Sequence, residues 1–367
     1  MVAAYPEIQP EHCLNTCLPN LGKPACTRCM DRCPADAITL NPDHAPQLHT
    51  SACTGCTGCV PACPADAIEH EALSAVSLLQ QARQLVMQGQ SEINVACNAV
   101  TDTHPGLSVH CHASWNPAML ASMAAEGVRI LHLEGIDQCS SCPARHGSSL
   151  MQQTEKDYAT LNKSLGIQLH ISHKAKEIVV EKPLPVAEPE PQRRAFFRSL
   201  IPTLTQGAAM AASQIGQAVN QATALEMPEA DTEHDSHLPV RLQLFLRALP
   251  RLQANFTPMP FMPSLPLGAI QANARCTACN QCVEQCPTKA LDIREFGVNK
   301  ILEFQPDVCT GCKQCINTCP EDALESLPGI SLPSVLTQRA RPLIMVHEDM
   351  LKKEPGRSDR PELKEDD

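Results

Sequence analysis

The pattern of hydrophobic and polar residues is most regular in the middle of the chain, between residues 71 and 180. Hydrophobic residues recur at helical spacing over 72–88, which predicts an amphipathic helix. Short apolar runs that are typical of strands occur at residues 92–97, 107–111, 128–135 and 167–172.

Two further helices are predicted between these strand-like runs. The first covers 116–127, because Asn116 is a suitable N-cap, Pro117 is tolerated in the first turn, and Gly127 suits the C-terminal end. The second is expected from roughly residue 143 to 164. Strands that alternate with helices favour a parallel sheet, so the region 71–180 predicts a small α/β domain.

The segments that follow are less regular. Residues 181–192 are rich in Pro and Glu, which indicates an extended spacer. The stretch after it begins with Arg193 and Arg194 and resembles a twin-arginine export motif, but polar residues interrupt its apolar part, and we interpret it as an amphipathic linker helix. Residues 226–270 are expected to be irregular and to wrap over another surface. The highly charged end of the chain is predicted to be disordered.

Composition narrows the range of functions. The net charge of −11 argues against nucleic acid as the main partner, because phosphate binding needs a basic surface. No run of about 18 apolar residues occurs, so no transmembrane helix is expected. Only 3% of the residues are aromatic, so conventional hydrophobic cores must be small.

Cysteine changes this picture most, because the 367 residues include 21 cysteines. A secreted protein would hold them as disulfides, whereas a cytosolic protein would use them as metal ligands. The N-terminal residues show no basic segment followed by an apolar run, so no secretory signal is expected. The cysteines are therefore interpreted as reduced metal ligands in a cytoplasmic protein.

Four stretches of the chain repeat one cysteine pattern. Three have the full spacing C-x2-C-x2-C-x3-C-P and begin at Cys53, Cys276 and Cys309, whereas the fourth begins at Cys26 and lacks the first cysteine. Cys17 is predicted to supply the missing ligand, and Cys13 is the alternative. The cysteines of the four motifs are Cys26, Cys29, Cys33, Cys53, Cys56, Cys59, Cys63, Cys276, Cys279, Cys282, Cys286, Cys309, Cys312, Cys315 and Cys319.

The residues between these cysteines suit an iron–sulfur site. Gly55, Gly58 and Gly311 permit a positive φ and a close approach of backbone N–H groups to sulfur. The alanine that follows each motif is predicted to provide small apolar cover. A structural zinc site usually needs two CxxC pairs that are separated by a longer loop, which these serial runs do not match. The last cysteine of each copy is followed by a proline that turns the chain away, at Pro34, Pro64, Pro287 and Pro320.

The four stretches closely resemble the bacterial dicluster ferredoxins. In that family the fourth cysteine of one motif ligates the cluster of the other motif, so the resemblance implies four [4Fe-4S] clusters with crossed ligands. The implied sets are Cys33, Cys53, Cys56 and Cys59; Cys26, Cys29 and Cys63 with Cys17 or Cys13; Cys276, Cys279, Cys282 and Cys319; and Cys286, Cys309, Cys312 and Cys315.

Four more cysteines lie at or just after predicted strand ends in the α/β region, namely Cys97, Cys111, Cys139 and Cys142. The carboxyl ends of parallel strands form a crevice, so these thiols are expected to converge there on a fifth metal site, most simply another iron–sulfur cluster. A redox-active CxxC pair, a zinc site and plain buried thiols are the alternatives. The neighbouring His110, His112 and His146 are interpreted as surface or supporting groups, not as ligands.

Residues 109–147, which hold three of these four cysteines, also resemble the small iron–sulfur subunit of methyl-viologen-reducing hydrogenases. That family has the order strand, cysteine, helix, strand and CxxC. The resemblance implies that electrons pass to a flavin-containing or other reductase partner.

The predicted fold class is α+β, with two dicluster ferredoxin-like modules (1–70 and 271–330) flanking a small parallel-sheet domain (71–180). A linker at 181–270 and a charged tail at 331–367 complete the division. No GxGxxG fingerprint, P-loop or Ser/His/Asp constellation is present, so the sequence predicts no place for a nicotinamide, a flavin or a pterin.

The predicted function is that of a polyferredoxin, which relays single electrons through four or five clusters between redox partner proteins. One alternative is a reductase with catalysis at the central four-cysteine site. The other is an assembly or docking factor for a molybdenum oxidoreductase, because short motifs like the one at Arg193 also occur in accessory ferredoxins of molybdenum reductases.

Overall fold

The structure is a computed structural model that describes residues 5–17, 26–100, 106–173, 238–252 and 258–347. All of these residues belong to one compact unit. The predicted spacer, the predicted linker helix after it and the last 20 residues lie outside the described part. None of the helices among the described residues is long and apolar enough to cross a membrane.

The central part of the chain forms a four-stranded sheet with the order β6-β5-β7-β8, in which every pair is parallel. The predicted parallel sheet is therefore confirmed. Its strands are β5 (Glu92–Cys97), β6 (Leu107–Val109), β7 (Ile130–Glu134) and β8 (His170–Ser172).

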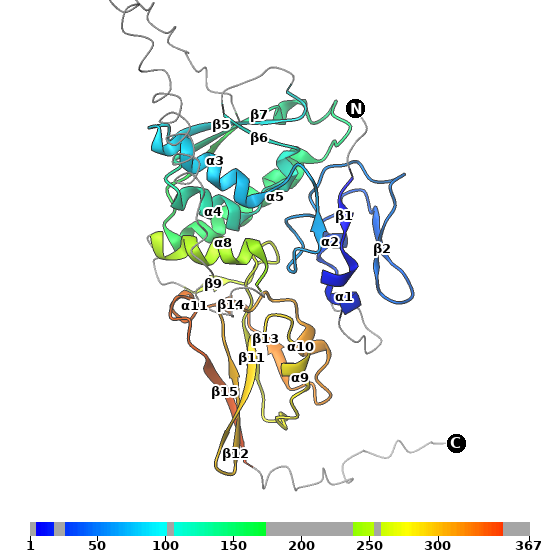
Figure 1. Ribbon diagram of the computed structural model, residues 1–367, viewed down its shortest axis with the longest axis vertical. Coiled ribbons are helices and arrows are strands. Elements are labelled where there is room, and N and C mark those ends of the chain that lie inside the picture. Colours follow the sequence, from blue (N-terminus) through cyan, green and yellow to red (C-terminus); the bar gives the residue numbers. More distant parts are fainter. Residues whose placement is uncertain (1–4, 18–25, 101–105, 174–237, 253–257, 348–367) are drawn as a thin grey trace, which may run out of the picture. The chain divides into compact units, whose positions relative to one another are not determined.

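The helices of this part are α3 (Ala75–Met87), α4 (Pro117–Ala125) and α5 (Gly147–Leu165) (Figure 1). Two short 3-10 turns, η2 (His112–Ser114) and η3 (Ile136–Gln138), lie between them. The predicted cap of α4 is confirmed, because the Asn116 side chain accepts a hydrogen bond of 2.7 Å from the backbone N–H of Met119. The helix α5 begins later than the sequence predicted. Its start is delayed by Arg145, whose φ of 53° is not helical.

Residues 226–270 were expected to be irregular, and this expectation is wrong for α8 (Val240–Ala248) and η6 (Leu249–Arg251). Helix α8 packs on α4 and buries Leu242 and Phe245 completely. Together with Leu249 these residues recur at helical spacing, a signal that the surrounding prolines hid.

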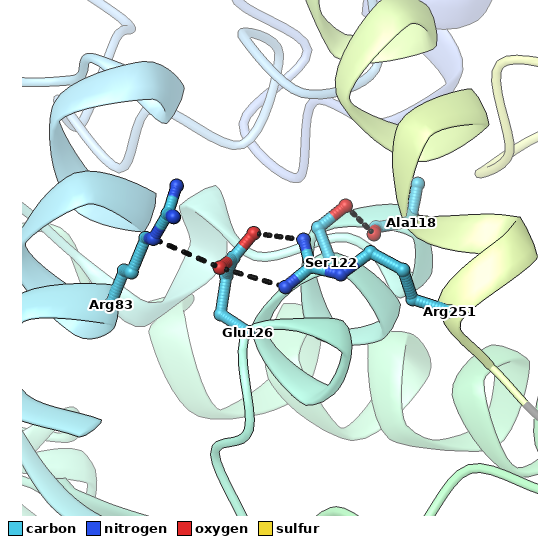
Figure 2. Close-up of polar contacts among 5 residues, drawn as sticks. All are labelled: Arg83, Ala118, Ser122, Glu126 and Arg251. Atoms are coloured by element: carbon cyan, nitrogen blue, oxygen red, sulfur yellow. Dashed lines mark hydrogen bonds and ion pairs between the residues drawn. The ribbon is translucent and has the colours of Figure 1, made fainter. Parts of the chain in front are cut away.

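An ion-pair cluster joins the surfaces of three helical elements (Figure 2). Arg251 of η6 donates to both carboxylate oxygens of Glu126, at 2.6 and 3.1 Å, and Arg83 of α3 lies 4.0 Å from the same carboxylate. Within α4, the Ser122 hydroxyl donates to the Ala118 carbonyl at 2.9 Å. Glu126 follows α4 directly, so these contacts help to hold α3, α4 and η6 together.

The two cysteine-rich parts share a topology. In each, a strand before the first motif pairs antiparallel with a strand directly after the second motif, as β1 (Glu7–Ile8) with β4 (Ile68–Glu69) and as β10 (Ile270–Ala272) with β13 (Leu324–Ser326). In each, the strand after the first motif also pairs with the next strand along the chain, as β2 (Ile38–Leu40) with β3 (Pro46–Leu48) and as β11 (Leu291–Phe296) with β12 (Asn299–Phe304). This duplication in space follows the duplication of the sequence motif.

The N-terminal elements are β1 (Glu7–Ile8), η1 (Pro10–His12), α1 (Leu14–Cys17), α2 (Arg28–Asp31), β2 (Ile38–Leu40), β3 (Pro46–Leu48) and β4 (Ile68–Glu69). The C-terminal elements are β9 (Met259–Pro260), β10 (Ile270–Ala272), α9 (Gln281–Glu284), β11 (Leu291–Phe296), β12 (Asn299–Phe304), α10 (Gln314–Asn317), β13 (Leu324–Ser326), β14 (Gly329–Ile330), α11 (Leu332–Leu336) and β15 (Arg341–His347). The prediction of a charged tail from residue 331 is wrong for 331–347, because α11 buries Leu332 and Val335 and β15 pairs with β12.

Candidate metal centres

We call the first group of thiols the Cys53 set; it comprises Cys33, Cys53, Cys56 and Cys59. Cys56 and Cys59 are buried. Burial raises the pKa of Cys59, and the neighbouring thiols raise it further, with Cys33 and Cys53 among them. The backbone N–H of Gly55 donates to Cys53 Sγ at 3.4 Å. Burial raises the pKa of Cys53 and Cys33 raises it further, so Cys33 lies near cysteines of the other motif, which is compatible with the crossed arrangement that the resemblance implies.

The second group is the Cys26 set; it comprises Cys13, Cys26, Cys29 and Cys63. These four cysteines line one hollow with about 390 Å³ of empty space. Burial raises the pKa of Cys29 to about 12, and the thiols of Cys26, Cys63 and Cys13 also contribute. Burial likewise raises the pKa of Cys63 to about 11.

Cys13, which the sequence analysis gave as the alternative to Cys17, lines this hollow. The buried Asn15 lies two residues further on, and its side chain accepts from the backbone N–H of Cys26 and donates to its carbonyl, both at 2.9 Å. This two-way bond fixes the start of α1 against the first cysteine of the motif. The side chain of Cys17 lies outside the described part of the chain.

The C-terminal thiols form two further groups. The Cys276 set, Cys276, Cys279, Cys282 and Cys319, lines a hollow of about 310 Å³. The Cys309 set, Cys286, Cys309, Cys312 and Cys315, lines one of about 460 Å³. Burial raises the pKa of both Cys282 and Cys309 to about 12. Here too, the last cysteine of each motif lies with the first three of the other.

The alanine after each motif has a role that the sequence analysis missed. Its backbone N–H donates to the sulfur of the last motif cysteine, at 3.3, 3.2, 3.1 and 3.2 Å in the four copies. The residue before each alanine has a positive φ, which turns the N–H toward the sulfur. Such N–H···S bonds stabilise a thiolate and help to set the potential of a cluster. The four donors are Ala37, Ala67, Ala290 and Ala323.

The glycines of the motifs act in two ways. Gly55 and Gly311 have φ of 69° and 66°, as predicted. The prediction of a positive φ is wrong for Gly58, because that conformation falls on the preceding Thr57. Gly58 instead permits close packing, since a Cβ there would lie 2.7 Å from Leu150 Cδ1 and the end of that side chain would have to shift.

The fifth group, the Cys97 set, comprises Cys97, Cys111, Cys139 and Cys142. The structure brings these cysteines together at the carboxyl ends of β5, β6 and β7. Burial raises the pKa of Cys111 to about 12, and the thiols of Cys97 and Cys139 contribute. Glycines leave room for the sulfurs: a Cβ at Gly147 would lie 3.0 Å from Cys111 Sγ and 3.1 Å from Cys139 Sγ.

The histidines near this set support the backbone. His110 Nε2 lies 3.0 Å from the Gly55 carbonyl, and His112 Nε2 lies 2.8 Å from the Glu134 carbonyl. Burial lowers the pKa of both rings, which favours the neutral form. His110 thereby connects the Cys97 set to the loop of the Cys53 set.

The chemistry of these groups fits iron–sulfur clusters. Each of the five groups offers four thiols, nearly all of them buried or partly buried, and metal binding replaces the proton on each sulfur. Among the described residues, no group of three or more His, Cys, Asp or Glu side chains is close enough to hold a single metal ion. The sulfurs of a four-iron cluster each bind a different iron, so they stand farther apart than ligands of one ion.

Comparison with known families agrees with this chemistry in both cysteine-rich parts. Residues 275–323 match the family model of the 4Fe-4S dicluster domain, and residues 23–74 match that of the LdpA Fe-S cluster-binding domain. No curated protein and no solved structure matches the chain at a significant level. The chain is thus an iron–sulfur protein with ferredoxin-like domains.

Proposed function

We propose that this protein is a polyferredoxin that carries single electrons along five [4Fe-4S] clusters, one in each cysteine set. The clusters supply one-electron exchange without bond chemistry, and the chain spaces and shields them. In the second set Cys13 is the ligand, in place of Cys17. The observation that carries the proposal is that hydrogen bonds join neighbouring sets: His110, beside Cys111, bonds to Gly55 of the Cys53 set, and Arg28 of the Cys26 motif bonds to Gly311 of the Cys309 set.

Thiols that raise one another's pKa across set boundaries agree with one continuous order of the five sets, because such an effect requires them to lie near each other. Besides burial, the thiol of Cys56 in the Cys53 set raises the pKa of Cys111 in the Cys97 set. In the same way, the thiol of Cys29 in the Cys26 set raises the pKa of Cys59. The line therefore runs from the Cys97 set through the Cys53 set to the Cys26 set.

The same relation continues into the C-terminal part. Besides burial, the thiol of Cys312 in the Cys309 set raises the pKa of Cys26, and the thiol of Cys282 in the Cys276 set raises the pKa of Cys315. The Cys276 set thus ends the line, and its Cys279 is exposed at the surface. An exposed ligand at one end suits exchange with a partner protein.

The proposed partners are redox proteins, with flavin-containing and molybdenum-dependent oxidoreductases as candidates. The net charge of −11 favours docking on basic surfaces. Three of the four thiols of the Cys97 set are buried, which supports a relay site over a substrate site at that position.

The test is a count of iron and acid-labile sulfide after oxygen-free purification, combined with EPR of the reduced protein. About 20 irons per chain are expected for five four-iron clusters, with broadened signals from neighbouring reduced clusters. About 16 irons per chain would mean four clusters and would show that the Cys97 set holds none. Sharp, non-interacting signals would contradict the continuous order.

A further inference from the structure

One backbone carbonyl is the contact point to a neighbouring part in two of the cysteine sets. It belongs to the residue before the second cysteine of the motif, which is Gly55 in the Cys53 set and Gly311 in the Cys309 set. His110 Nε2 lies 3.0 Å from the Gly55 carbonyl, and Arg28 Nη2 donates to the Gly311 carbonyl at 2.9 Å. In both cases the donor belongs to a segment that carries cysteines of a different set.

The same glycines bond to sulfur in their own sets. The backbone N–H of Gly55 donates to Cys53 Sγ at 3.4 Å. Burial raises the pKa of Cys309, and a hydrogen bond from the backbone of Gly311 acts against this rise. Both glycines have a positive φ, which places no strain on glycine. Each loop is therefore fixed twice, by its sulfur through the N–H and by a distant donor through the carbonyl.

The ring of His110 is held in one orientation by Asn98. Its Nδ1 lies 3.0 Å from the side-chain nitrogen of Asn98, and the backbone N–H of Asn98 donates to the His110 carbonyl at 3.3 Å. A carbonyl can only accept, so Nε2 carries the proton that bonds to Gly55, and Nδ1 accepts from the Asn98 amide. Asn98 follows Cys97 and His110 precedes Cys111, so both residues are tied to the Cys97 set.

His70 restrains the same ring from the N-terminal part of the chain. The centroids of the two imidazole rings lie 4.5 Å apart, and 53° separates their planes. His70 is buried, and its Nδ1 accepts from the backbone N–H of Ala72 at 3.2 Å. The His110 ring is thus in contact with His70 and bonded at both nitrogens, which leaves it little freedom to rotate.

We propose that His110 is a positioning residue of the relay, which holds the Gly55 loop so that the Gly55 N–H stays on Cys53 Sγ and raises the midpoint potential of the Cys53 centre. A hydrogen bond to a ligand sulfur helps to set the potential, since it stabilises the extra negative charge of the reduced form. The inference rests on the proposed function, because the potential is that of the cluster at the Cys53 set.

Two substitutions of His110 separate the bond to Gly55 from the other contacts of the ring. The side-chain nitrogen of Gln reaches the position of Nε2, so His110→Gln keeps a donor to the Gly55 carbonyl. The shorter Asn places its amide near the position of Nδ1, so His110→Asn keeps a polar group beside Asn98 and loses the bond to Gly55. Both variants carry the same amide, which makes them a matched pair.

The measurements use the full chain with its clusters, purified without oxygen. A redox titration followed by EPR gives the midpoint potential of the Cys53 centre, which is identified by the signal that Cys53→Ser removes. This potential is expected to fall in His110→Asn and to equal the wild-type value in His110→Gln. Hydrogen exchange at residues 55–56 is expected to be about fivefold faster in His110→Asn, the factor for one neutral hydrogen bond.

The comparison of the two variants decides the outcome. A fall of the potential in His110→Asn alone supports the proposal. An unchanged or raised potential in His110→Asn would overturn it, and so would an equal fall in both variants, because the donor to Gly55 would then not matter. If His110→Asn loses the Cys53 centre, Asn98→Ala replaces it, since that variant frees the ring at Nδ1. A smaller fall is expected there, and no fall would overturn the proposal.

The iron count separates this proposal from the relay. About 20 irons per chain with an unchanged potential in His110→Asn would refute the role of His110 and leave the relay standing. About 16 irons per chain would remove the cluster of the Cys97 set, while the potential of the Cys53 centre and its response to the two variants would remain measurable.

Discussion

Replacement of Arg28 by Gln is expected to loosen the contact between the two ferredoxin-like parts. Arg28 lies in α2, and its Nη2 donates to the Gly311 carbonyl at 2.9 Å and to the Thr310 carbonyl at 3.3 Å. These carbonyls belong to the loop of the Cys309 set, more than 280 positions along the chain. Gln is a conservative choice, because Gln281 and Gln314 occupy the equivalent position in the C-terminal motifs.

The magnitude follows from the geometry. A hydrogen bond from a charged donor contributes about 1.5–3 kcal/mol, and both bonds here come from one nitrogen, so we count them as one. Because Arg28 is only half-buried, the lower end applies, about 1.5 kcal/mol. This free-energy loss corresponds to an approximately tenfold larger population of molecules in which the contact between Arg28 and the Cys309 loop is open.

Hydrogen exchange of the oxidised protein with its clusters measures this change. Amides of residues 309–312 are expected to exchange about tenfold faster in Arg28→Gln, if they exchange through opening of this contact. Arg32→Gln is the control, because Arg32 donates to Leu150 and Thr154 of α5 instead, at 3.0 and 2.9 Å. It should speed exchange in α5 and leave 309–312 unchanged.

Charge gives a second, independent readout. Arg28 lies among the thiols of Cys26, Cys309 and Cys312, so its loss removes a positive charge beside two cysteine sets. Adding an electron there becomes harder, and the midpoint potentials of both centres are expected to fall. Arg28→Lys keeps the charge but loses the planar fork, so it should preserve the potentials and still speed exchange. Unchanged exchange at 309–312 in Arg28→Gln would refute this account of the contact.

Four further predictions concern the ligands and their surroundings. Cys33→Ser should damage the centre formed by the second motif, not that of its own motif. EPR of the variant checks this, and loss of only the centre of its own motif would contradict the crossed ligands. Cys13→Ser should lose about four irons per chain, the content of one cluster, whereas Cys17→Ser should keep them. Gly147→Ala should lose the central centre, although alanine favours a helix by about 1 kcal/mol elsewhere; full iron content would contradict the steric argument. Lys289→Gly should raise thermal stability by about 0.5–1 kcal/mol, because Lys289 is exposed with a φ of 53°; a lower melting temperature would show that this φ is not strained.

The predictable parts of the structure are those with strong local signals. The parallel sheet and the cap at Asn116 follow from short-range periodicity and capping chemistry. The grouping of the motif cysteines follows from the spacing and from the resemblance to dicluster ferredoxins. Helix α8 was missed because its apolar positions lie between proline-rich stretches.

Other features depend on contacts between distant residues, which no local pattern encodes. The position of Cys13 beside the Cys26 motif depends on the bond between Asn15 and Cys26 across a loop. The space at Gly147 is needed only because two cysteines from other segments meet there. The alanine N–H···S bonds had a sequence signal, since an alanine recurs at one position in all four motifs, but the small side chain suggested cover and not a hydrogen bond.

One signal in the sequence does point to the contacts between the parts, namely where the motif copies differ. The residue before the third cysteine of each motif is Arg28, Gly58, Gln281 or Gln314. The two glutamines lie in the C-terminal copies, whereas both deviating residues make contacts with other parts of the chain. Arg28 reaches the loop of the Cys309 set, and Gly58 permits close packing against Leu150.

Arg32 extends the same argument to a second position of the motif. The other copies hold Ala62, Gln285 and Thr318 there, and only Arg32 bonds to α5. A ligand loop that must hold a cluster has few free positions, so residues that depart from the repeat are those that the cluster does not constrain. In this chain those positions join the Cys26 set to one neighbouring part and the Cys53 set to the other, which is the arrangement that a continuous relay requires.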